Sequence, residues 1–316
     1  MDQTTAIINR VLPILLLIGL GHVIRRRRFL PESTVDDLRK IAVNLALPAV
    51  LFVSFLQTDL RPAYIVVFIA VFLLCVGLYA LGVVLQRRLR VQQAYFPFLM
   101  TGFEYGMLGV SLFGSAYGLE NLGYIAVVDL GHELFIWFVF LALLLIRRDG
   151  LRSSGELARA FFRSPVILAI LAGIALNLLG AQEVLFQAPV LGGVMAALQF
   201  LSQLTVPLIL IIVGYGIHFD RAGVSEAVLV VGLRLAVVLP LALALNAVLI
   251  RGLLNLEAGF AVALFTLLAL PPPFIIPLYM PAGDGPERRY VNNALTLYTV
   301  ISIALFAVIL VLNPQL

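Results

Sequence analysis

Ionisable side chains fall inside two apolar stretches of this sequence. Glu104 lies in TGFEYGMLGVSLFG, and Asp129, His132 and Glu133 lie in DLGHELF. Because charged groups are costly to place in hydrocarbon, such residues at membrane depth usually belong to a substrate or proton pathway. The residues of the second stretch are three and four positions apart, so they share one face of a helix. We predict that Glu104 takes up and releases a proton and that the other three assist this proton coupling.

Other roles stay open for these residues and for one base. Asp129, His132 and Glu133 could instead coordinate a cation, form a buried network with Glu104, or lie near the outer end of a span. Arg234 stands in the middle of another apolar stretch. It is expected to neutralise one of the acids, to meet an anionic substrate, or to extend towards the cytoplasmic surface.

The backbone around Glu104 is predicted to be irregular, as is a second stretch, LALPPPFIIPLYM, at residues 268–280. The prolines are Pro271, Pro272, Pro273 and Pro277, and the glycines near Glu104 are Gly102, Gly106, Gly109 and Gly114. A proline inside a helix costs roughly 3 kcal/mol. Non-helical backbone survives at membrane depth only when it is buried in protein or lines a wet cavity. Both stretches therefore predict interrupted helices at a transport site, with close helix packing as the alternative for the glycines.

Composition identifies the surroundings of these stretches as a membrane. The 316 residues are 62% apolar and 12% charged, with a mean hydropathy of +1.08. Since about 20 apolar residues cross a bilayer, the chain offers ten spans, and its fold class is predicted to be all-α integral membrane. The spans are 5–24, 38–56, 62–85, 94–117, 123–146, 164–181, 192–216, 224–250, 257–280 and 290–312.

The distribution of positive charge predicts the orientation. Most of the 21 lysines and arginines gather in alternate loops, near residues 25–40, 87–90, 147–163, 221 and 288–289. The positive-inside rule then makes these loops cytoplasmic and both termini extracytoplasmic, in a plasma (inner) membrane protein. The first span is expected to be retained, because its positive cluster follows the apolar run. With the bases in membrane loops, the net charge of +4 does not predict a nucleic-acid partner.

Two similar segments predict an internal repeat. NLALPAVLF places Asn44 four residues before a proline in the second span, and QLTVPLILI places Gln203 likewise in the seventh. We predict a first five-helix repeat at 1–146, a cytoplasmic linker at 147–163 and a second repeat at 164–316. With five spans each, the halves enter the membrane from opposite sides, as in secondary transporters whose broken helices meet near the midplane.

The segments VLPILLLIGLGHVIRRRRFLPESTVDDLRKIAVNLALPAVLF, LALPPPFIIPLYM and NNALTLYTVISIALF resemble the auxin efflux carrier family, which includes plant PIN-type exporters. The resemblance implies ten helices in two inverted repeats with helices 4 and 9 crossed, as in sodium/bile-acid symporters. It implies scaffold helices 1, 2, 6 and 7, and transport helices 3–5 and 8–10 that move as an elevator. Family members carry small organic anions, and homodimers through the scaffold are common in elevator folds.

The sequence departs from this family at the crossed helices. Glu104 stands where the family has asparagine, and Ser111 stands where it has proline. Ile275 replaces an asparagine that commonly follows the proline of helix 9. The carboxamides that the resemblance would assign to substrate binding are therefore absent from both crossed segments. An ionised Glu104 would also repel a bound carboxylate, so an anion site here requires Glu104 to be protonated or paired.

The expected function is secondary active transport, as efflux of a small, carboxylate-bearing solute coupled to protons. The expected substrate-binding residues are Glu104, Tyr105, Gly106, Gly109, Ser111, Pro271, Pro272, Pro273, Ile275, Asn44 and Gln203. No cofactor and no metal is expected. The alternatives are a cationic or neutral solute, a channel, and a sensor that binds without transport. An enzyme is not expected, because the chain lacks a phosphate-binding loop, its polar loops are short, and Ser111 near Glu104 carries no recognisable nucleophile motif.

Overall fold

The computed structural model describes residues 3–149, 163–217, 224–280 and 285–316. All regular structure in these ranges is helical, as the composition predicts. In the first half the helices are α1 (Gln3–Arg26), α2 (Glu32–Ile41), α3 (Leu47–Gln57), α4 (Ala63–Arg88), α5 (Phe96–Leu99), α6 (Val110–Tyr117), α7 (Leu122–Phe135) and α8 (Leu141–Asp149). In the second half they are α10 (Pro165–Leu178), α11 (Gln182–Gln187), α12 (Pro189–Gly216), α13 (Val224–Leu245), α14 (Ala258–Ala269) and α15 (Pro286–Leu312).

Short segments of wider or tighter turns extend or join these helices. The wider ones are η1 (Ala42–Ala46), η2 (Tyr105–Gly109), η4 (Ile136–Phe140) and η5 (Asn246–Leu253), and the tighter ones are η3 (Leu119–Asn121) and η6 (Ile276–Tyr279). As a result α2, η1 and α3 form one continuous helix, and so do α13 and η5. Continuous helices of this kind reach the length that a bilayer requires.

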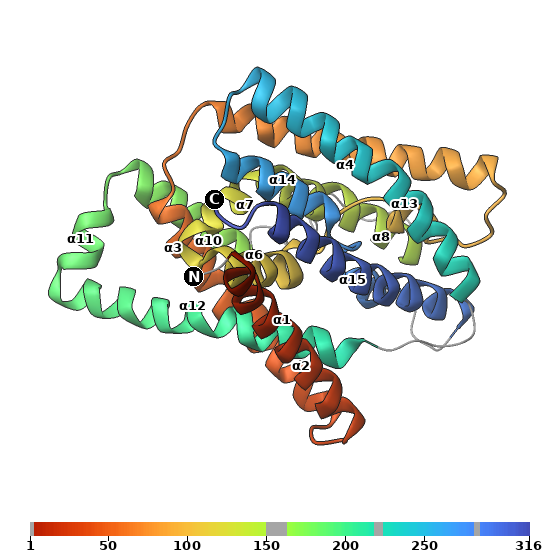
Figure 1. Cartoon of the computed structure of the whole chain (residues 1–316), viewed down its shortest axis with the longest axis horizontal. Coiled ribbons are helices and arrows are strands. Elements are labelled where there is room, and N and C mark those ends of the chain that lie inside the picture. The colour runs from red at the N-terminus through yellow and green to blue at the C-terminus, as the bar shows by residue number, and fades with distance from the viewer. Residues whose placement is uncertain (1–2, 150–162, 218–223, 281–284) are drawn as a thin grey trace.

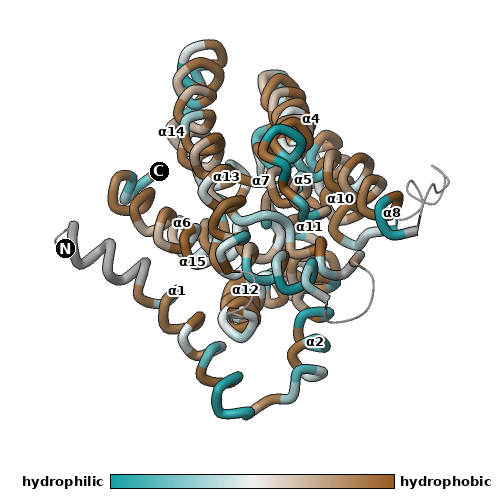
Figure 2. The backbone as a smooth tube through the Cα atoms, turned by 90° about the vertical axis from the view of Figure 1, so that its right-hand side faces the viewer, coloured by the Kyte–Doolittle hydropathy of each residue, from teal (hydrophilic) through white to brown (hydrophobic). Residues whose placement is uncertain are grey.

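Six helices among the described residues are long and apolar enough to cross a membrane. They are Glu32–Gln57, Ala63–Arg88, Leu119–Arg148, Pro189–Gly216, Val224–Leu253 and Pro286–Leu312. Figure 2 shows apolar residues along the helices and hydrophilic residues in the turn between α1 and α2. Large apolar side chains such as Ile65, Leu73 and Phe200 are exposed on the outside, where lipid would cover them. The protein is therefore a multi-pass membrane protein.

Helix ends differ from the predicted spans by a few residues. The second span begins at Glu32 instead of residue 38, because the charged first turn of α2 continues the helix beyond the apolar run. The predicted linker 147–163 is described only at its ends: α8 continues to Asp149, and residues 150–162 lie outside the described part.

Two membrane segments are interrupted where the prolines and glycines predict. In the first, α5 ends at Leu99 and η2 begins at Tyr105, and Gly102 between them has a φ of 67°. In the second, α14 ends at Ala269 and η6 begins at Ile276. We call residues 100–104 the first break and 270–275 the second break.

Two pairs of packed helices join the two halves of the chain, and two other pairs each lie within one half. α1 packs on α12 and α3 packs on α10, whereas α4 packs on α7 and α13 on α15, as can be followed in Figure 1. Glycines allow α1 and α12 to approach closely, because a Cβ on Gly21 would lie 2.0 Å from the Ile211 carbonyl oxygen. A Cβ on Gly214 would lie equally close to the Ile18 carbonyl oxygen.

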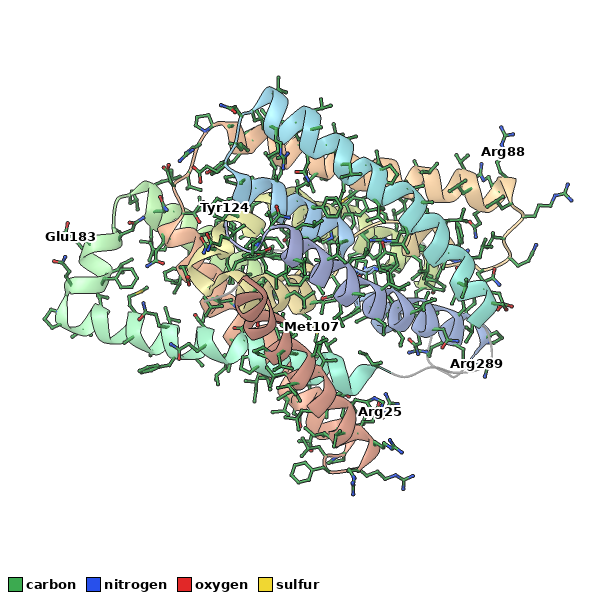
Figure 3. The ribbon with its side chains drawn as sticks, in the orientation of Figure 1. Arg25, Arg88, Met107, Tyr124, Glu183 and Arg289 are labelled. Carbon is green, nitrogen blue, oxygen red and sulfur yellow. The ribbon has the colours of Figure 1, made fainter. Side chains whose placement is uncertain are left out.

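The arginine-rich turns lie towards one side of the helix bundle. In Figure 3, Arg25, Arg88 and Arg289 lie towards the right, Met107 lies near the centre, and Glu183 lies at the left edge. The N and C labels both lie in the left half of Figure 1, the half that also holds α11. The C-terminus therefore lies nearer to α11 in this view, and the arginine-rich turns lie on the other side.

Candidate functional site

The two breaks contact each other in the interior of the bundle. The main-chain N–H of Glu104 donates to the carbonyl oxygen of Pro271 at 2.8 Å. A Cβ on Gly102 would lie 2.7 Å from Cγ of Pro273, so glycine is required there both for its positive φ and for this approach. We call this meeting point the crossing.

Glu104 ties the two breaks together through its carboxylate. Its Oε1 accepts a hydrogen bond from the main-chain N–H of Met107 at 3.2 Å, and its Oε2 accepts from the N–H of Phe274 at 2.5 Å. The side chain is 8% exposed. The Met107 N–H lies in the first turn of the helix formed by η2 and α6, where main-chain donors have no partner within the helix. The Glu104 carboxyl group is therefore bound by one donor from η2 and one from the second break.

Arg234 supplies the opposite charge from α13. One guanidinium nitrogen donates to the Leu99 carbonyl oxygen at 2.9 Å, and another donates to the Gly102 carbonyl oxygen at 2.5 Å and more weakly to that of Leu270 at 3.4 Å. Arg234 is fully buried. It therefore does not extend to the cytoplasmic surface, and within the described residues it forms no ion pair with an acid.

A hydrogen-bonded chain leads from the first break into α7. The N–H of Phe103 donates to Nε2 of His132 at 2.8 Å, and the other ring nitrogen lies 2.7 Å from Oδ1 of Asp129. Since Nε2 accepts, the ring proton belongs on Nδ1, which donates to Asp129. Glu133, one helical turn from Asp129 on α7, accepts a hydrogen bond from Nε1 of Trp137 at 2.9 Å. Asp129 and His132 thus form a buried chain that reaches Phe103, the residue next to Glu104, and the partly buried Glu133 lies beside them on α7.

Other predicted site residues take different positions. The Tyr105 hydroxyl is buried and has no hydrogen-bond partner among the described residues, so it is available to a ligand. Gly109 packs on Leu270 of the second break. Pro272 is buried, and Ile275 is partly buried. Ser111 instead donates to the Met107 carbonyl oxygen within its own helix.

The predicted scaffold residues are not brought into the crossing. Asn44 is exposed and donates to the Lys40 carbonyl oxygen one turn earlier. Gln203 lines a cavity of about 450 Å³. The lining residues of this cavity are Val50, Val53, Ser54, Gln57, Leu119, Glu120, Gln199, Ser202 and Gln203. α3 approaches the crossing at Leu47 instead, which lies 3.3 Å from where a Cβ on Gly106 would be.

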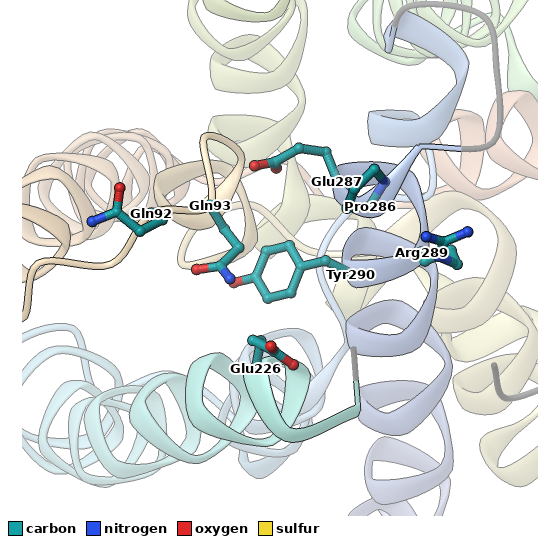
Figure 4. Close-up of a pocket in the computed structure, with 7 residues that line it drawn as sticks. All are labelled: Gln92, Gln93, Glu226, Pro286, Glu287, Arg289 and Tyr290. Carbon is teal, nitrogen blue, oxygen red and sulfur yellow. The ribbon is translucent and has the colours of Figure 1, made fainter. Parts of the chain in front are cut away.

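A second cavity, of about 230 Å³, lies away from the crossing at the ends of helices (Figure 4). Its lining comes from the turn at Gln92 and Gln93, from Glu226 near the start of α13, and from the first turn of α15. The Glu287 carboxylate there accepts from the Ala94 main-chain N–H at 2.9 Å. Among the residues described, no group of three His, Cys, Asp or Glu side chains is placed to hold a metal ion.

Sequence reasoning missed the main-chain partners of Glu104 and of Arg234. Backbone donors and acceptors carry no residue-type signal, so only the predicted breaks could have indicated them. It also missed Asn177, whose amide nitrogen donates to the carbonyl oxygens of Phe55, Leu56 and Thr58 at 2.7–2.9 Å. Asn177 thereby satisfies carbonyls at the end of α3, which otherwise have no partner within the helix.

Known sequences similar to this chain are membrane transport proteins. Residues 6–157 match a family described as membrane transport protein. An uncharacterized transporter of Methanothermobacter thermautotrophicus is 30% identical over 234 residues, which cover 72% of this chain and 74% of the relative.

Proposed function

Because the chain belongs to the membrane transport protein family, in which the auxin efflux carriers are placed, we propose that it is a secondary transporter of a small organic anion. The family and the transporter relative support a transporter. The proposal places the substrate at the crossing and couples its movement to a proton on Glu104. The observation that carries it is the Glu104 carboxylate, which accepts from the N–H of Phe274 in the second break and from the N–H of Met107 in η2.

The mechanism follows from the groups that Glu104 binds. When Glu104 is ionised, its two oxygens accept hydrogen bonds from the N–H groups of Met107 and Phe274. A second carboxylate about 4 Å away would then be repelled by roughly 4 kcal/mol at an effective dielectric of about 20. When Glu104 is protonated, this repulsion ends and the two N–H groups can turn to a substrate carboxylate. The unpartnered hydroxyl of Tyr105 would add a third donor.

A proton on Glu104 then accompanies each bound anion, so the loaded crossing carries the same net charge as the empty, ionised one. Both forms can therefore cross the membrane field at similar cost, and the movement of one proton with one anion transfers no net charge. The network of His132, Asp129 and Glu133 would supply or receive that proton.

Helix packing supports an inverted repeat. The contact of α1 with α12 joins the first span of one half to the second span of the other, and the contact of α10 with α3 does the same with the halves exchanged. The pairs α4 with α7 and α13 with α15 also correspond. We propose on this basis that α1, α3, α10 and α12 belong to the scaffold and that the remaining spans form the moving transport domain.

The proposed orientation places the arginine-rich turns in the cytoplasm and both termini outside a plasma (inner) membrane. The separation of Arg25, Arg88 and Arg289 from Glu183 along the bundle supports it (Figure 3). Net export and a homodimer through the scaffold helices complete the proposal.

A thermal-shift measurement with three ligands of similar shape tests the substrate class. Benzoate, benzylamine and benzyl alcohol differ in charge, and a ligand that binds the native state raises the unfolding temperature, Tm. We expect benzoate and related carboxylates to raise Tm, more at acidic than at neutral pH. No stabilisation by any carboxylate would contradict the anion class, and absence of counterflow in proteoliposomes with a stabilising ligand would indicate a sensor.

A second candidate is a cationic solute. An ionised Glu104 keeps its negative charge while its oxygens accept from Met107 and Phe274. That charge could attract an amine. Stabilisation by benzylamine that weakens on acidification would favour this candidate.

A further inference from the structure

The guanidinium of Arg234 stands where an inverted-repeat transporter would be expected to bind a coupling cation. In such transporters, carbonyl oxygens of unwound backbone and of half-helix ends coordinate a sodium ion or bind a proton. Here the carbonyl oxygens of Leu99 and Gly102 accept hydrogen bonds from Arg234 at 2.9 and 2.5 Å. The Leu270 carbonyl, at the end of α14, lies 3.4 Å from the same side chain. A cation thus already binds the carbonyl groups of both breaks.

The surroundings of Arg234 suit a cation without an acid. Its guanidinium carbon lies 5.0 Å from the ring centre of Phe103 and 5.1 Å from that of Tyr298, and aromatic faces attract cations within about 6 Å. The C-terminal end of α14 contributes the negative end of a helix dipole. In the part of the chain described, no carboxylate lies within 4.0 Å of Arg234. Its charge is therefore balanced by carbonyl dipoles and ring faces, as that of a bound metal cation would be.

We propose that Arg234 is a built-in replacement for a coupling cation and that the protein therefore works without sodium. The guanidinium is attached to α13 and fully buried, so it cannot leave the site. A cation that cannot leave cannot transfer energy from its gradient. Its positive charge would also repel a sodium ion from the same carbonyl groups. The role of Arg234 is then to position both breaks, while coupling runs through another ion.

This inference rests on the proposed transport function, because a coupling cation matters only to a transporter. Its test measures thermal stability and needs neither substrate nor transport. The full-length protein is unfolded thermally in sodium chloride and in N-methylglucamine chloride of equal ionic strength. We expect wild type to have the same Tm in both salts. We expect Arg234→Ala to lower Tm by several degrees and low guanidinium chloride to restore part of the loss, with sodium restoring more than N-methylglucamine.

Two further variants complete the experiment. Arg251→Ala removes an exposed arginine from η5, which continues the same helix, and should behave as wild type in every salt. Arg234→Lys retains a positive charge and should remain insensitive to sodium even if Arg234→Ala cannot be purified. A wild-type or Arg234→Lys Tm that rises specifically with sodium would overturn the proposal. So would a loss in Arg234→Ala that no cation restores, because a role in packing alone predicts that result.

Discussion

The main-chain N–H of Phe274 donates to Oε2 of Glu104 at 2.5 Å, across 170 positions of sequence. This bond and the 3.2 Å bond from Met107 to Oε1 occupy both oxygens of the carboxylate, one with a donor from the second break and one with a donor from η2. A change in the charge of Glu104 therefore alters the contacts of both interrupted segments at once.

Glu104→Gln should remove the pH dependence of anion binding. The variant cannot ionise and so resembles the protonated state. If one proton accompanies each anion, wild-type affinity should fall as pH rises, approaching about tenfold per pH unit once Glu104 is ionised. The variant should keep its acidic-pH affinity for benzoate at neutral pH. Benzoate titrations monitored by thermal shift at several pH values measure this, and a pH dependence unchanged in the variant would exclude Glu104 as the proton carrier.

Gly102→Ala should destabilise the protein. The backbone there has a φ of 67°, which costs a residue with a Cβ about 1–2 kcal/mol, and the new methyl group would collide with the ring of Pro273. Gly232→Ala is a matched control, because a Cβ there meets no atom within 4 Å and alanine favours the helix by about 1 kcal/mol. We expect Tm to fall in the first variant and to stay or rise in the second. Equal Tm values would argue against the close contact of the two breaks.

His132→Leu should lower the free energy of unfolding. The variant leaves the Phe103 N–H and the Asp129 carboxyl without their buried partner, at about 1–3 kcal/mol for each unpaired group. His22→Leu changes an exposed histidine on α1 and serves as the control. Denaturant titration of both variants gives the comparison. If the two lose the same stability, the network from the first break into α7 does not contribute to the fold.

Gly21→Ala should weaken the contact between α1 and α12. A Cβ there would lie 2.0 Å from the Ile211 carbonyl oxygen, so the two backbones must separate and lose packing along the whole contact. Gly19→Ala adds the same methyl group to the same helix where nothing lies within 4 Å. We expect a lower Tm only for Gly21→Ala, and a retained Tm would mean that α1 can move without cost.

The sequence predicts a structural element where the residues that cause it lie within that element. Prolines at 271–273 and glycines at 102–109 predicted both breaks, since these residue types act on their own backbone. The apolar character of the spans was equally clear from hydropathy, although helix ends were not, because α2 extends beyond the apolar run. The family resemblance was confirmed by comparison with known sequences.

The contacts at the crossing were not predictable, because main-chain groups provide them. Nothing in the residue types of Met107 and Phe274 indicates that their N–H groups bind Glu104. For Arg234, the sequence predicts an ion pair, a substrate contact or an extension to the surface, and the structure shows instead that it binds carbonyl groups of both breaks. The amide-to-proline pattern at Asn44 and Gln203 placed neither residue in the crossing, because the Asn44 amide is bonded within its own helix and Gln203 lines another cavity.

The hydrogen bonds at the crossing also have a consequence for synthesis of the protein. The Leu99 and Gly102 carbonyl groups depend on Arg234, which is made 135 and 132 residues later, and the Glu104 N–H depends on Pro271. Main-chain groups without partners are costly in lipid. We therefore expect the fourth span to remain shielded by water or by the insertion machinery until the second half emerges from the ribosome. The crossing would then be among the last parts of the protein to form.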